Sequence, residues 1–190
     1  MTKKKFSPPL PFKVVAALAM LSAISIICGK YLAIRGGDIL RFSFENLPII
    51  FAGLAFGPVS GVLVGVVSDL VGCVMVGYSI NPLVTLGAAA IGAVSGFSGI
   101  IAKKMSIKCT ASVIISTLLA HIFGSVIIKT YGLAAYYDLP LWALMLWRLL
   151  NYVIVGGIEC ALLVVLFKNK EITRLISEMK PKVKRKESSK

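Results

Sequence analysis

The strongest constraint on the fold is a stretch of 23 uncharged residues between Glu45 and Asp69, interrupted only by Gly57-Pro58. Helical residues rise about 1.5 Å each, so about 20 of them cross a hydrocarbon layer of about 30 Å. An ionised carboxylate in hydrocarbon costs several kcal/mol, so an acid beside such a stretch usually faces a protein interior or a wet cavity. Asp69 is therefore a candidate site residue.

The composition assigns the chain to a membrane. Its 190 residues are 57% hydrophobic and 15% charged, with a mean hydropathy of +0.89. A soluble domain of this length cannot hide so much apolar surface, whereas a bilayer covers it. We expect an all-α integral membrane protein that crosses the cell membrane several times.

Six apolar runs are long enough to be read as membrane-spanning helices. We expect these spans at 12–33, 40–57, 58–77, 82–102, 109–129 and 140–167, between an N-terminal segment (1–11) and a basic tail (168–190). The second span is short and contains Pro48, which predicts a tilt or a kink. The first resembles a signal peptide, but no convincing cleavage site precedes Lys30, so we interpret it as a membrane helix.

The positive charge predicts the orientation and argues against nucleic-acid binding. Of 21 Lys and Arg residues, 16 lie at the two ends or in the loop between the fourth and fifth spans, which the positive-inside rule places in the cytoplasm. Both termini are therefore expected to be cytoplasmic. The basic residues form no face interleaved with aromatics, as nucleic acid would require. The tail 180–190 is expected to be disordered near anionic lipid.

Polar side chains from four spans are expected at one depth. Counting residues from the outer end of each span places them about 8 to 12 Å below the surface. This layer contains Asp69, His121, Arg148, Glu45 and Asn46. Asn151 shares the helix face of Arg148, and so does Glu159, which we place in the cytoplasmic half with a structural or partner-facing role.

Aromatic and basic residues near this layer predict a wet cavity that opens outward. Phe44, Tyr78 and Trp147 are candidates for its lining, with an interfacial belt or the core as the alternative. Lys30, Arg35 and Arg41 lie above the layer. Two further alternatives remain open: Asp69 and Arg148 as a buried structural ion pair, and His121 as a hydrogen-bonded core residue.

Small residues recur at a spacing of four, which permits close helix approach. The glycine pairs Gly53/Gly57, Gly61/Gly65 and Gly92/Gly96 are expected to pack inside the bundle. Ala19 and Ala23 lie in the cytoplasmic half of the first span, where a separate partner has access to the same face. The four cysteines show no metal-ligand spacing and are interpreted as packing residues, and no metal or cofactor is expected.

The stretches LPII (47–50), FGP (56–58), DLVG (69–72) and WRLLNY (147–152) resemble the substrate-binding S components of energy-coupling factor (ECF) vitamin transporters, and most closely the folate-specific members. The resemblance covers 12–167. It implies a six-helix bundle that captures folate outside the cell, docks on a transmembrane scaffold subunit with two ATPase subunits, and topples to release its cargo. It also implies a docking role for Ala19 and Ala23. Consistently, the chain has no GxxxxGK[ST] phosphate loop.

A pterin ring suits the predicted polar layer. Asp69 is expected to accept its paired donors, while Arg148 and Asn151 serve its carbonyl and ring nitrogens. The glutamate tail is then expected to point toward Lys30, Arg35 or Arg41.

Three alternatives to a folate-binding subunit remain open. One keeps the architecture and changes the cargo to riboflavin or a queuosine precursor. Another is a small intramembrane enzyme that uses Asp69, His121 and Arg148, although no nucleophile with a base supports it. The last is a channel or an autonomous carrier.

Overall fold

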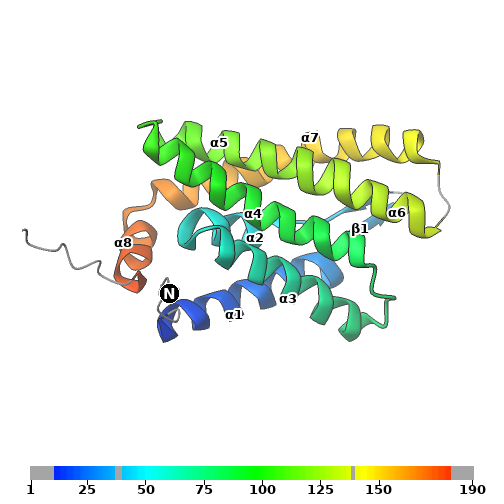
Figure 1. Ribbon diagram of the computed structural model, residues 1–190, viewed down its shortest axis with the longest axis horizontal. Coiled ribbons are helices and arrows are strands. Elements are labelled where there is room, and N and C mark those ends of the chain that lie inside the picture. The colour runs from blue at the N-terminus through cyan, green and yellow to red at the C-terminus, as the bar shows by residue number, and fades with distance from the viewer. Residues whose placement is uncertain (1–10, 37–39, 138–139, 181–190) are drawn as a thin grey trace, which may run out of the picture.

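A computed structural model describes residues 11–36, 40–137 and 140–180, and Figure 1 shows their arrangement. The helical elements are α1 (Phe12–Ile26), η1 (Ile27–Tyr31), α2 (Asn46–Phe56), α3 (Pro58–Val76), α4 (Pro82–Lys104), α5 (Cys109–Ala120), η2 (His121–Lys129), α6 (Thr130–Tyr137), α7 (Leu141–Lys168) and α8 (Lys170–Met179). Strands β1 (Ile34–Gly36) and β2 (Leu40–Phe42) pair antiparallel, with Ile34 opposite Phe42.

The described part of the chain contains five helices that are long and apolar enough to cross a membrane. They are Phe12–Tyr31, Pro58–Val76, Pro82–Lys104, Cys109–Tyr136 and Leu141–Lys168. Helix α2 is apolar but has 11 residues, so it extends only about 16 Å. The expectation of a helical protein with membrane-crossing helices therefore holds.

Two predicted span boundaries were wrong. The second span was expected at 40–57, but residues 40–42 form strand β2 and the helix begins only at Asn46. Pro48 lies in the first turn of α2, where its missing N–H costs no helical hydrogen bond. The fifth was expected to end at 129, but η2 and α6 continue the helix to Tyr137.

The helices form three layers, with α2 and α4 between the α1/α3 pair and the α5/α7 pair (Figure 1). Helix α2 lies in the centre, and its side chains Ile49, Ile50 and Ala52 are fully buried. They pack with Val64 of α3 and Ile91 of α4 in the hydrophobic core. A short helix is therefore enclosed by long ones, which cover its apolar surface.

Glycines bring α3 and α4 into backbone contact, as predicted. A Cβ at Gly61 would lie 2.5 Å from the carbonyl oxygen of Gly92, and a Cβ at Gly92 would overlap the backbone of Gly61. Gly57 was wrongly assigned to this packing. A Cβ there would meet nothing within 4 Å, and the glycine instead serves its φ of +100° between α2 and α3.

Helix α8 covers one end of the bundle and begins within the predicted basic tail. The Asn169 side chain accepts a hydrogen bond from the Glu171 N–H and so caps it. Ile176 is buried and Met179 packs against the core. Burial and the nearby charge of Lys103 lower the pKa of Lys180. The predicted disorder concerns residues that, beyond Lys180, lie outside the described ranges.

Replacement of Gly92 by Ala is expected to destabilise the protein, because the new methyl group collides with the Gly61 backbone. Overpacking of this kind costs about 1–3 kcal/mol, which corresponds to a Tm lower by roughly 5 °C in thermal unfolding of the purified protein. The control is Gly157→Ala on α7, where nothing lies within 4 Å of the added atom. Equal Tm values for the two variants would contradict the proposed role of the glycine contact.

Candidate functional site

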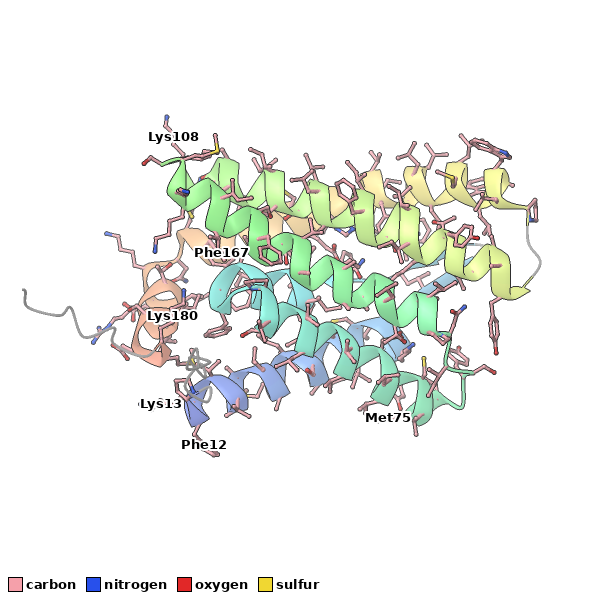
Figure 2. All side chains as sticks on the ribbon, in the orientation of Figure 1. Phe12, Lys13, Met75, Lys108, Phe167 and Lys180 are labelled. Atoms are coloured by element: carbon pink, nitrogen blue, oxygen red, sulfur yellow. The ribbon has the colours of Figure 1, made fainter. Side chains whose placement is uncertain are left out.

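A cavity of about 200 Å³ opens where α3, α4, η1, η2 and α7 meet. Its lining is rich in charged and polar side chains: Lys30, Glu45, Asp69, Cys73, Tyr78, Ser79, Asn81, Val84, Lys129, Leu133 and Arg148. Figure 2 shows Met75, at this end of α3, at the opposite end of the bundle from Lys13, Lys108 and Lys180. The cavity and the basic end therefore lie on opposite faces of the membrane-crossing bundle.

An ion pair between a buried lysine and a partly exposed glutamate supports one wall of the cavity. Lys129, whose side chain is 3% exposed, places Nζ 2.8 Å from Glu45 Oε1 and 3.3 Å from Asn46 Oδ1. Asn46 in turn donates a long hydrogen bond of 3.4 Å to Ser125 Oγ. The network joins the start of α2 to η2, so the two cavity-lining charges also fix the relative position of two elements.

Asp69 faces the cavity and is held by a hydroxyl group. Thr85 Oγ1 donates a hydrogen bond of 2.6 Å to Asp69 Oδ2, and Cys73 Sγ lies 4.0 Å from Oδ1. Among the residues that the structure describes, no ion pair joins Asp69 to Arg148. The alternative of a structural ion pair between Asp69 and Arg148 is therefore not supported. Both side chains line the same cavity.

Two cations line the cavity without a partner carboxylate among the described ion pairs. Lys30 Nζ lies 3.5 Å from Cys73 Sγ and 5.6 Å from the centroid of the Tyr78 ring. Arg148 Nη1 donates a long hydrogen bond of 3.5 Å to the Ser125 carbonyl oxygen. Asp69 can accept hydrogen bonds from donor groups of a ligand, and the two cations can attract an anionic group of the same ligand.

The structure gathers part of the predicted site. Of the predicted residues, those in the lining are Asp69, Arg148, Glu45, Tyr78 and Lys30, and Asn46 is buried directly behind them.

Other predicted residues lie outside this lining. Phe44 and Asn151 are half-buried, and Trp147 is 47% exposed. Arg35 and Arg41 are opposite each other in the β1–β2 register, and their side chains lie outside the described part of the structure. Their proposed contacts with a ligand remain predictions.

His121 does not lie in the polar layer, contrary to the depth estimate. It is buried, and its Nε2 is 2.7 Å from Oε2 of the fully buried Glu159. The estimate counted from residue 128, whereas the helix runs on to Tyr137, so His121 lies 16 residues, or about 24 Å, from that end. That depth matches Glu159, for which a cytoplasmic-half position was predicted.

Sequence reasoning missed Lys129 and Thr85, and it placed Asn81 among the polar groups near the cavity without assigning it to the site. Lys129 was treated as the end of a span because the helix was expected to stop there, yet it is a lone charge between apolar runs, the same signal that identified Asp69. Asn81 caps α4 by accepting a hydrogen bond from the Leu83 N–H, and it donates one of 2.9 Å to the Gly132 carbonyl oxygen.

The side chains that line the cavity suit binding rather than catalysis. They combine two carboxylates and three cations with amide, hydroxyl and aromatic groups. In the described residues no group of three or more His, Cys, Asp or Glu side chains is placed to hold a metal ion. A polar or charged small molecule is the ligand class that this set accommodates.

A family model described as "ECF transporter, substrate-specific component" matches residues 13–167. Among solved structures, the chain is similar to a crystal structure of FolT bound with folic acid, with 25% identity, a TM-score of 0.63, and coverage of 79% of this chain and 88% of that chain. It also shares the fold of the S component of a bacterial ECF transporter, with 20% identity, a TM-score of 0.59, and coverage of 89% and 98%. Among curated proteins, nothing matches significantly.

Removal of one member of the Lys129–Glu45 ion pair is expected to destabilise the ligand-free protein. Lys129→Met removes the cation 2.8 Å from Glu45 Oε1, at a cost of at most about 3–5 kcal/mol, the range for a fully buried pair, because Glu45 is 21% exposed. The double variant Lys129→Met/Glu45→Leu removes both charges and is expected to recover much of the loss in Tm. If the double variant unfolds at an even lower temperature than Lys129→Met, the pair is not the source of the effect.

Proposed function

We propose that this chain, which belongs to the family of ECF transporter substrate-specific components, is the folate-binding subunit of such a transporter. It is a multi-pass protein of the cell membrane and a transport component rather than an enzyme, which removes the intramembrane-enzyme alternative. The observation that supports folate most directly is the cavity whose lining combines Asp69 with Lys30 and Arg148, two cations that have no ion pair among the described residues.

Asp69 supplies the acceptor that a pterin edge needs. One of its oxygens is engaged by Thr85, and Oδ1 has only the Cys73 thiol at 4.0 Å among the described hydrogen-bond partners. Two adjacent N–H donors of a pterin match a carboxylate, while Arg148 across the cavity donates to the ring carbonyl. The contact between Asn151 and the pterin ring, which the sequence predicts, is also part of this proposal.

The size of the cavity favours enclosure of the ring end alone. At about 200 Å³ it is smaller than the roughly 300–1,000 Å³ of pockets that enclose a drug-sized molecule. The remainder of folate therefore extends out of the cavity. Lys30 at the wall and Arg35 and Arg41 on the β1–β2 hairpin supply positive charge for its carboxylates.

The proposed topology has six crossings with both termini in the cytoplasm, α2 being the short second crossing. Lys13, Lys108 and Lys180 lie at one end of the bundle (Figure 2), and basic residues prefer the cytoplasmic side. The cavity at the other end then faces outward, where the vitamin is captured.

The proposed partner surface is the exposed face of α1. Ala19 and Ala23 are exposed, and Met20 beside them is 68% exposed. Small side chains there allow close approach of a helix from the transmembrane scaffold subunit. Two ATPase subunits supply the energy, and the chain topples in the membrane to deliver the vitamin.

Asp69→Ala is expected to weaken folate binding by about tenfold or more, because a charged hydrogen bond is worth about 1.5–3 kcal/mol. Calorimetric titration of the purified protein measures the loss. Glu178→Gln, which changes an exposed carboxylate on α8, is the control and is expected to bind like the wild type. Undiminished affinity in Asp69→Ala would remove the carboxylate from the site.

Competition experiments test the cargo itself. Labelled folate bound to the wild type is expected to be displaced by unlabelled folate and not by riboflavin or a queuosine precursor. Stronger displacement by either compound would favour the alternative of another heterocyclic cargo. Vesicles that contain this protein alone are expected to show no folate accumulation, whereas accumulation would indicate an autonomous carrier.

Ala19→Trp/Ala23→Trp is expected to abolish folate uptake by the assembled transporter and to leave folate binding unchanged, because bulk on this face prevents close helix contact. The matched control is Ala161→Trp, an exposed alanine at a similar distance from the basic end but on α7. Uptake by the double variant equal to that of the control would rule out docking through this face of α1.

A further inference from the structure

A carboxylate and an imidazole that do not line the cavity are in contact inside the bundle. Glu159 of α7 is fully buried, His121 at the start of η2 is 4% exposed, and Nε2 and Oε2 are 2.7 Å apart. Two ionisable groups buried separately would each carry a large desolvation cost, which the contact reduces. Such a costly arrangement in a bundle of apolar helices calls for a role.

A row of side-chain contacts joins this pair to the cavity. The rings of His121 and Tyr152 have centroids 5.1 Å apart, with planes inclined by 33°. The guanidinium carbon of Arg148 lies 5.9 Å from the centroid of the Tyr152 ring. Since Arg148 lines the cavity, the row runs from Glu159 through His121 and Tyr152 to the cavity wall.

The backbone of α7 fixes where the imidazole lies. A Cβ at Gly156 would be 3.2 Å from Cδ2 and 3.5 Å from Nε2 of His121, whereas a Cβ at the adjacent Gly157 would meet nothing within 4 Å. The absence of a side chain at Gly156, but not at Gly157, therefore leaves room for the His121 ring. In that position the ring contacts both Glu159 and Tyr152.

We propose that Glu159 and His121 are positioning residues for the ligand site, because they hold the Tyr152 ring in place and, through that ring, orient Arg148. Arginine has a large rotamer entropy to lose on binding, and a guanidinium already restrained on an aromatic face loses less of it. The effect on vitamin affinity rests on the proposed function, whereas the restraint of Arg148 does not.

The first experiment is a double-mutant cycle on folate affinity, measured by calorimetry with the full-length protein. Tyr152→Leu is expected to weaken binding about tenfold and Glu159→Gln severalfold. Their combination is expected to be no weaker than Tyr152→Leu alone, because the pair acts through the ring. Tyr152→Phe, which keeps the ring, is expected to retain affinity. Effects that multiply, or wild-type affinity in Glu159→Gln, would overturn the proposal.

The two adjacent glycines provide a matched pair of variants. Gly156→Ala crowds the imidazole and is expected to weaken folate binding severalfold, while Gly157→Ala leaves it unchanged. Both replacements raise helix propensity equally, so a general effect on α7 would alter both variants alike. Equal affinities would contradict the positioning role.

A measurement on the ligand-free protein tests the positioning of Arg148 independently of which vitamin the protein binds. The side-chain Nε–H signal of Arg148, identified by its loss in Arg148→Lys, is expected to report a restrained group by nuclear magnetic resonance in the ligand-free wild type. Its order parameter is expected to fall in Glu159→Gln and Gly156→Ala and to stay high in Gly157→Ala. Identical values in all four proteins would refute positioning even if folate binds, and failure of the wild type to bind folate would refute the proposed ligand alone.

Discussion

The architecture depends on keeping charge out of hydrocarbon. Lys129 and Glu45 form an ion pair of 2.8 Å at the point where α2 begins, and Asn46 adds a further oxygen at 3.3 Å. Because a lone charge on the buried Lys129 would be costly, this pair holds the start of α2 against η2. The same pair forms one wall of the cavity, so the forces that fix the bundle also shape its binding site.

Charges inside apolar sequence identified several of the residues that line the cavity, because a charge is costly inside a membrane. Asp69 and Arg148 stood out as charges inside apolar sequence, and both line the cavity. His121 was misplaced because its depth depends on where its helix ends, and continuation through η2 and α6 carries that end to Tyr137. Lys129 was missed for the same reason, since a lysine at a span end needs no explanation, whereas a buried one does.

Side-chain partnerships were beyond prediction from one sequence. The helix periodicity placed Arg148 and Glu159 on one face of the last span, but it did not reveal that Glu159 contacts His121. Residues 40–42 show a related limit. They were expected to begin the second span, but they pair with Ile34–Gly36, and this pairing provides backbone hydrogen bonds in a strand instead. An apolar composition indicates that a segment is buried in a membrane protein. Hydrogen bonding between distant segments decides whether that segment forms a helix or a strand.

The short central helix provides only part of the length of a membrane crossing. The 11 residues of α2 extend about 16 Å, roughly half of a hydrocarbon layer of about 30 Å. Glu45, immediately before α2, lines the cavity, so a molecule seated there lies beside the start of this short helix. Because α2 is much shorter than a membrane crossing, the longer helices around it have to seal the bundle beside the cavity.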